Sequence, residues 1–135
     1  MQYNVPTLGK VPDDRPEGVF RWMYCQVNGA SHADSRKTKA AEIMHLVNKY
    51  SVQGVAIAEH GTNFSTCPSY KRLSSWFNRD KQVTAREAWN KHQGEDAGNH
   101  LQGGTGLLAF EELRRYVKGG NNDFRRLGRW CSWKI

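Results

Sequence analysis

Hydrophobic and polar positions divide the chain into short elements, beginning with an apolar and aromatic run over residues 19–27. Asn28-Gly29 is a turn signal that ends the run, so the pattern predicts a largely buried strand. In residues 36–50 apolar side chains return every three or four positions, which predicts an amphipathic helix. The continuous apolar run 54–58 predicts a strand buried on both faces. The apolar stripe of the helix consists of Ala40, Ile43, Met44, Val47 and Tyr50.

Strand, helix and strand within about 40 residues predict a right-handed crossover with two parallel strands. The later pattern is less regular. We expect, in order, one or two helices in 70–92, a loop in 93–102, a strand entered through glycines in 103–110, a short helix or turn in 111–117, a loop in 118–123 and a final strand in 127–135. The pattern therefore predicts an α/β protein.

The two ends of the chain differ from its middle. Residues 1–18 contain three of the four prolines and little apolar periodicity, which predicts an extended leader. Residues 19–135 form the predicted structured part. The last expected strand stops within an alternating aromatic segment with nothing after it to pair with, and complete domains normally protect such an edge. We therefore expect residues 19–135 to be part of a larger domain that is truncated at its C-terminus.

Composition narrows the class of protein. Hydrophobic residues make up 38% of the 135 residues, and five Trp, five Tyr and five Phe provide bulky core material, which argues against general disorder. No apolar run is long enough to span a bilayer, and the first ten residues lack the apolar core of a signal peptide. We expect an intracellular protein, nuclear or cytoplasmic, that does not bind membranes. Cys25, Cys67 and Cys131 are too few and too widely spaced for a disulfide framework or a zinc site.

Charge favours a polyanionic partner. The net charge is +7, and because the first 19 residues hold three acids and two bases, the remainder carries +8. Such a surplus is typical of nucleic-acid binding, but it also serves solubility alone. Three basic residues, Arg36, Lys37 and Lys39, open the predicted helix, where the helix dipole disfavours cations. They indicate either a solvated basic face or a nearby bound anion.

Two polar residues follow the strands of the predicted crossover. Asn28 comes after the first strand and Glu59 directly after the second. Because parallel strands end at the same edge of a sheet, both side chains can reach one pocket there. An amide oxygen and a carboxylate are hard ligands that suit Mg²⁺. Taken alone, Asn28 is better interpreted as an Asn-Gly turn residue, whereas Glu59 could be a ligand or a solvated carboxylate.

These residues resemble a known family. The segments Val27-Asn28-Gly29 and 55–60, separated by an amphipathic helix, look like the opening of the endonuclease/exonuclease/phosphatase superfamily, which includes DNase I-like and apurinic-site endonucleases. The segments 103–108 and 128–130 resemble the two strands that follow in that family. The similarity is greatest to the endonuclease domain of non-long-terminal-repeat retrotransposons, and it covers residues 19–135.

The resemblance implies a fold, a reaction and a cofactor. Family members are four-layer α/β sandwiches that hydrolyse phosphoester bonds with Mg²⁺ or Mn²⁺. Glu59 matches the glutamate that holds the metal, and Asn28 matches the asparagine that orients the site. The implied substrate is DNA, with RNA as a further option.

The chain also departs from the family pattern. Neither the Asp-x-Asn motif that positions water and phosphate nor the later Asp-His pair occurs in the sequence. The resemblance therefore implies a partial DNase I-like sandwich, namely its N-terminal sheet and helix layer. We expect this fragment to be inactive by itself. Two alternatives stay open, a non-catalytic basic nucleic-acid-binding module and a phosphatase of the same fold.

A basic and aromatic cluster lies near the C-terminus and offers phosphate contacts and base stacking. The alternative is a solvated charged surface, and the same choice applies to Arg114-Arg115. The cluster consists of Arg125, Arg126, Arg129 and Trp130.

Overall fold

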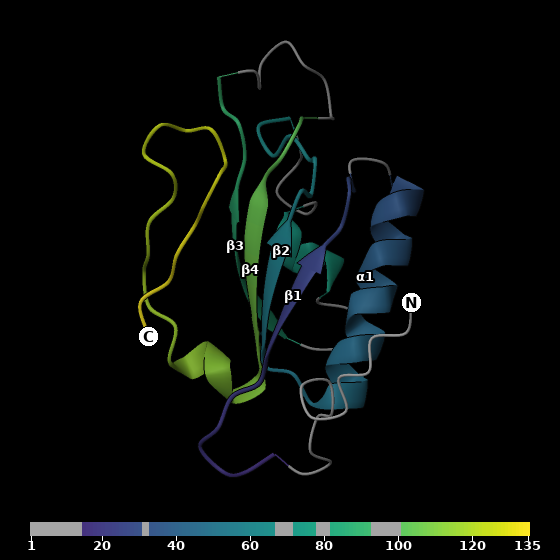
Figure 1. Ribbon diagram of the computed structural model, residues 1–135, viewed down its shortest axis with the longest axis vertical. Coiled ribbons are helices and arrows are strands. Elements are labelled where there is room, and N and C mark those ends of the chain that lie inside the picture. The colour runs from purple at the N-terminus through teal and green to yellow at the C-terminus, as the bar shows by residue number, and fades with distance from the viewer. Residues whose placement is uncertain (1–14, 31–32, 67–71, 78–81, 93–100) are drawn as a thin grey trace, which may run out of the picture.

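The protein is described by a computed structural model, which covers residues 15–30, 33–66, 72–77, 82–92 and 101–135 (Figure 1). These residues form a mixed four-stranded sheet in the order β1-β2-β4-β3, with one long helix. The strands are β1 (Trp22–Gln26), β2 (Gly54–Ala58), β3 (Val83–Ala88) and β4 (Thr105–Phe110). The helices are α1 (Ala33–Tyr50) and the two short 3₁₀ helices η2 (Leu73–Trp76) and η3 (Glu111–Arg115). The α/β prediction is thus confirmed at the level of class.

The crossover at the start of the chain is confirmed. β1 and β2 are parallel, with Trp22 opposite Gly54 and Gln26 opposite Ala58, and α1 connects them. Ser51 ends the helix in a left-handed conformation with φ of 51°, which turns the chain into β2. Both candidate site residues therefore follow strands that end at the same edge of the sheet.

The second half of the sheet is antiparallel. β4 pairs with β2 on one side and with β3 on the other. The strand entered through glycines and the short helix after it are confirmed as β4 and η3.

The expectation of helices in residues 70–92 is wrong in its larger part. Only η2 forms in the described residues of this segment, and the second half is the strand β3. In β3, Val83, Ala85 and Glu87 lie on one face while Thr84 and Arg86 lie on the other, so a charged residue occurs on each face and the apolar residues do not alternate strictly. Sheet pairing with β4 overrides the low strand propensity of its charged residues.

The core lies between the sheet and α1, and η2 closes it. The predicted helix stripe is confirmed, since Ala40, Ile43, Met44 and Val47 are buried and Tyr50 is partly buried. Three phenylalanines supply the bulk. Those side chains are Phe64, Phe77 and Phe110, each at most 1% exposed.

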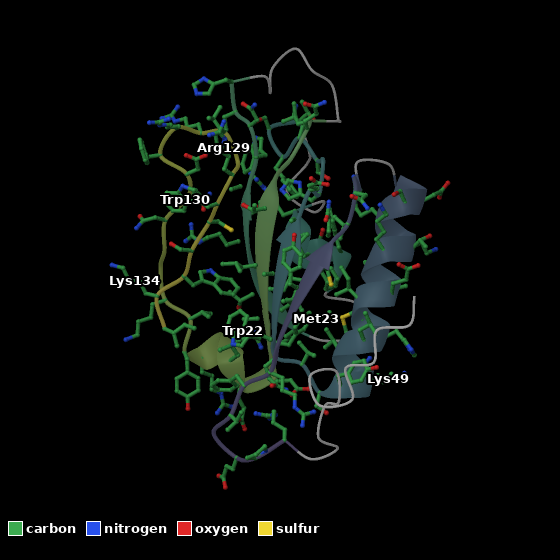
Figure 2. The ribbon with its side chains drawn as sticks, in the orientation of Figure 1. Trp22, Met23, Lys49, Arg129, Trp130 and Lys134 are labelled. Atoms are coloured by element: carbon green, nitrogen blue, oxygen red, sulfur yellow. The ribbon has the colours of Figure 1, made fainter. Side chains whose placement is uncertain are left out.

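The opposite face of the sheet is only partly covered. β1 is an edge strand, and its Trp22 and Tyr24 are 48% and 67% exposed, so the expectation of a largely buried first strand is wrong. Figure 2 shows Trp22 and Met23 on opposite sides of β1, with Met23 toward α1. In β2, Val55 and Ile57 are buried on the α1 side, whereas Ala56 on the other side is partly exposed. The expected burial of β2 therefore holds for one face.

The C-terminal segment does not form the expected strand. Residues 118–135 run along the side of the sheet opposite α1 (Figure 1), where Lys118 pairs with Lys134 and Asn122 with Cys131 in isolated bridges. Part of its hydrogen bonding is within its own hairpin, where the Ser132 amide donates to the Asn121 carbonyl at 2.8 Å, and Leu127 forms a further isolated bridge with Asn90, just after β3. Gly128, expected in a strand, has φ of +73° and belongs to a turn. The chain end is therefore paired within its own hairpin.

Candidate metal site and basic turn

Asn28 and Glu59 come together as the sequence predicts. The Oδ1 atom of Asn28 and the Oε2 atom of Glu59 both accept hydrogen bonds from the Nε2 atom of Gln26, at 3.2 and 2.7 Å. The two oxygens therefore flank one nitrogen atom at the carboxyl edge of β1 and β2. Asn28 and Glu59 line a cavity of about 420 Å³, together with Gly29, Gly61, Leu101, Gln102 and Gly103.

The backbone at this edge is held in an unusual conformation. Asn28 and Glu59 have φ of 51° and 58°, in the left-handed region that non-glycine residues rarely adopt. Backbone hydrogen bonds fix both, because the Gly29 amide donates to the Glu59 carbonyl at 2.7 Å and the Glu59 amide to the Gly104 carbonyl at 2.7 Å. Residues kept in such conformations by their surroundings are concentrated at functional sites.

Gln26 is a member of the site that the sequence reasoning missed. It is the last residue of β1, and it lies two positions before Asn28. The signal was the period of two along a strand, which places Gln26 on the same face as Trp22 and Tyr24, away from the core. Its exposed amide then reaches both oxygens.

The donor set fits a hard divalent cation that retains most of its water. One carboxylate and one amide oxygen converge, and the amide nitrogen of Gln26 lies between them where a cation would lie. Rotation of that amide would present its Oε1 atom as a third oxygen. In the described part of the chain, no three His, Cys, Asp or Glu side chains are grouped as a metal site.

The beginning of α1 holds the loop that carries Asn28. The Lys39 ammonium group donates to the carbonyl oxygens of Val27 and Gly29, the latter at 2.6 Å. Arg36 Nε donates to the Ala30 carbonyl at 3.2 Å. Arg36 and Lys39 are thus partly buried and bond to the loop carbonyls. This role is neither the solvated basic face nor the anion contact that we expected from the sequence.

His60 fixes the other side of the site. Its Nδ1 atom accepts from the Thr62 amide at 3.0 Å, so the second ring nitrogen carries the proton and donates to the Ala88 carbonyl at 2.9 Å. Burial lowers the pKa of His60 to about 4, and the bond to Ala88 opposes this only in part. A neutral, fully buried imidazole therefore ties the end of β2 to the end of β3, directly after Glu59.

The expected cluster of basic residues lies in a turn, here called the basic turn, residues 123–130. The buried carboxylate of Asp123 holds it, because Oδ1 accepts from the Arg125 amide at 2.9 Å and Oδ2 from the Arg129 amide at 3.3 Å. The side chains of Arg125, Arg126 and Arg129 are exposed.

The basic turn lies at the same edge of the sheet as Glu59. The Lys91 amide, just beyond β3, donates to the Arg126 carbonyl at 2.8 Å. The Thr105 hydroxyl, at the start of β4, donates to the Gly128 carbonyl at 3.4 Å. The Glu59 amide in turn donates to the carbonyl of Gly104, the residue before Thr105. Two consecutive residues therefore connect the loop of Glu59 with the basic turn. Figure 2 shows Arg129 near this end and Trp130 further along the segment.

The second arginine pair lies elsewhere. Arg114 and Arg115 belong to η3, which follows the far end of β4, so they lie at the opposite edge of the sheet. Arg114 bonds to Gln82 at 2.7 Å. Of the four residues proposed at the C-terminal cluster, Trp130 is 42% exposed and its carbonyl accepts from the Asp123 amide at 3.0 Å.

The cysteines in the described residues are partly buried. Burial raises the pKa of both the Cys25 and the Cys131 thiol, which disfavours the reactive thiolate. Cys67 and the leader residues 1–14 lie outside the described residues. In the part that the structure describes, no helix has the length and apolar character to cross a membrane.

Comparison with models of known protein families gives no match to this sequence, and comparison with curated proteins gives none either.

Proposed function

We propose that this chain is the N-terminal part of a metal-dependent phosphodiesterase domain of the endonuclease/exonuclease/phosphatase type, acting on DNA and similar to retroelement endonucleases. The observation that carries the proposal is the convergence of Asn28 Oδ1 and Glu59 Oε2 on one point at the carboxyl edge of a parallel strand pair. The mixed sheet with α1 on one face supports it as half of a DNase I-like sandwich. The partly exposed face with Trp22 and Tyr24 is where a second sheet would pack.

The geometry supports a proposed role for each of these residues. Glu59 would supply the charged ligand and Asn28 a neutral oxygen, while Gln26 orients both and yields its place to the cation. A bound Mg²⁺ or Mn²⁺ would polarise a phosphate ester and offset charge on the leaving oxygen. The exposed arginines of the basic turn would hold the neighbouring phosphates of the strand.

The sequence lacks the motifs that position water and phosphate in this family, so we expect the 135 residues to bind metal but to cleave DNA very slowly or not at all. The primary test is therefore a measurement of Mn²⁺ binding, in which electron paramagnetic resonance reports the concentration of the free ion. We expect one weak site in the wild-type chain, lost in Glu59→Gln and weakened in Asn28→Ala. Glu112→Gln, an exposed carboxylate in η3 at the other edge, is the matched control and should bind as the wild type does.

Equal Mn²⁺ binding by wild type and Glu59→Gln would refute the metal site. Plasmid nicking in Mg²⁺ is measured alongside for both proteins, and nicking that survives Glu59→Gln would also count against the proposal.

The alternative is a non-catalytic nucleic-acid-binding module, and the preformed basic turn favours it. It predicts salt-sensitive DNA binding with no dependence on metal or on Glu59. Metal-dependent nicking that is lost in Glu59→Gln would exclude it.

A further inference from the structure

Phe124 is the most exposed large hydrophobic side chain of the described residues, at 78%. A single exposed aromatic ring is common on proteins and needs no partner. Phe124 differs because it lies within the basic turn, directly after the buried Asp123, whose carboxylate accepts hydrogen bonds from the backbone amides of Arg125 and Arg129. The turn therefore holds the backbone that carries the ring before any partner binds.

The surroundings of the ring are positively charged. The Arg125 guanidinium lies 5.6 Å from the centre of the Phe124 ring, and Arg126 and Arg129 are exposed in the same turn. Lys91 and His92 are adjacent, since the His92 ring bonds to the Arg125 carbonyl at 2.7 Å. The acid of the turn, Asp123, is buried and faces backbone amides. The outer surface of the turn thus combines one exposed ring, with Arg125 over one of its faces, and further basic side chains.

We propose that the basic turn binds a single-stranded nucleic acid, with Phe124 stacked on an unpaired base and Arg125 and Arg129 on the flanking phosphates. The proposal rests on the nucleic-acid partner of the proposed function and names the form of that partner. Stacking on a face of a base requires that the face be free, which an unpaired strand offers at no cost. In a duplex the same ring could act only as a wedge, at a cost of a few kcal/mol for unstacking.

Trp130 is less suited to this role although its ring is larger. It is 42% exposed, and it belongs to the hairpin that pairs with residues 118–122. Phe124 therefore carries the stacking contact.

The test measures fluorescence anisotropy of a labelled oligothymidylate and of a labelled duplex across a salt series, in EDTA so that the metal site plays no part. Phe124→Ala should weaken binding to the single strand by at least about fivefold, with an unchanged salt dependence. Phe124→Trp should retain the affinity. Tyr116→Ala removes a 53% exposed aromatic ring after Arg114-Arg115 at the opposite edge of the sheet, and it should bind as the wild type does.

The arginines are tested by the slope of affinity against salt. Arg125→Gln with Arg129→Gln should lower the slope of log K against log salt by about 1.4, because each phosphate contact to a single strand contributes about 0.7. Arg115→Gln with Lys118→Gln removes the same charge from exposed positions at the opposite edge and should leave the slope nearly unchanged.

Three results would overturn the proposal. They are wild-type affinity in Phe124→Ala, an equal loss in Tyr116→Ala, and a loss that is the same for duplex and single strand. The outcome is separate from that of the metal test, because a chain that binds Mn²⁺ but loses no affinity in Phe124→Ala refutes the turn alone. Conversely, if Phe124→Ala weakens single-strand binding but the chain binds no Mn²⁺, the proposal for the basic turn stands and the proposed metal-dependent nuclease is refuted.

Discussion

Protonation of His60 should destabilise the fold in mild acid. The ring is fully buried, it accepts one hydrogen bond through Nδ1 from the Thr62 amide, and it donates one to the Ala88 carbonyl. A proton on Nδ1 would remove the acceptor and place two donors against each other. It would also put a charge between β2, β3 and Phe64, whose ring centre lies 5.1 Å away.

The size and the pH range follow from the pKa. Burial lowers the pKa of His60 from 6.5 to about 4, so between these values the unfolded chain binds more protons than the folded one. Stability is therefore complete above about pH 6.5, and it falls as the pH decreases toward 4. One pKa unit corresponds to about 1.4 kcal/mol, which gives a total loss of about 3 kcal/mol.

Urea unfolding at several pH values, followed by tryptophan fluorescence, measures this loss. Glu87 complicates the raw curve, because burial raises its pKa and its contribution has the opposite sign above pH 4.5. The difference between wild type and His60→Gln removes that background. His60→Gln should be less stable than the wild type at pH 7, and the gap should narrow as the pH falls to 4.

His45→Gln is the control, because His45 is exposed on α1. It removes one imidazole but should keep the pH dependence of the wild type. If the gap between wild type and His60→Gln stayed constant from pH 7 to 4, the assignment of a neutral buried His60 would be wrong.

Four further substitutions test the frame of the site. Gly104→Ala should cost about 2–4 kcal/mol in urea unfolding, because φ is +94° and the added Cβ would lie 2.3 Å from the His60 ring. Gly128→Ala should loosen the basic turn, because the added Cβ would lie 2.6 Å from the Trp89 backbone, and it should leave the Mn²⁺ affinity unchanged. We expect faster amide hydrogen exchange at Arg129 in this variant. Lys39→Met should weaken Mn²⁺ binding more than Lys39→Arg does, because the methionine removes the charged donor that the Val27 and Gly29 carbonyls share. Arg72→Met should cost about 1 kcal/mol at pH 7 and less at pH 4, because it removes the 3.2 Å ion pair to Glu87.

The sequence contained enough information for the crossover and for the convergence of Asn28 and Glu59. A helix with a clean apolar stripe and a short apolar strand have few alternative arrangements, and parallel strands bring their carboxyl ends together by geometry. The strand β3 was missed because Arg86 and Glu87 lower its apparent strand propensity. The strand is defined by its pairing with β4, where Glu87 lies opposite Gly106 and is paired by Arg72.

The prediction of a strand in the C-terminal segment was wrong for a different reason. Its aromatic alternation resembles a strand, but Asp123 and Gly128 form a turn in which the Asp123 carboxylate accepts from the Arg125 amide, and the residues after the turn pair with 118–122. A side chain that caps its own backbone competes with sheet pairing, and the alternation pattern does not record that competition. The same turn brings the arginines to the edge of the sheet, which no pattern in the segment indicated.

The hydrogen bonds at Glu59 separate its proposed role in metal binding from any role in folding. The backbone of the Glu59 loop is held by Gly29 and Gly104 and not by its carboxylate, which is exposed and bonds only to Gln26 among the described residues. Glutamine at position 59 can accept the same hydrogen bond through its amide oxygen. We therefore expect the melting temperature of Glu59→Gln to stay within about 2 °C of the wild type, while its Mn²⁺ affinity is lost. A drop well beyond that range would show that the carboxylate supports the fold, and the loss of metal binding could then no longer be assigned to the missing charge.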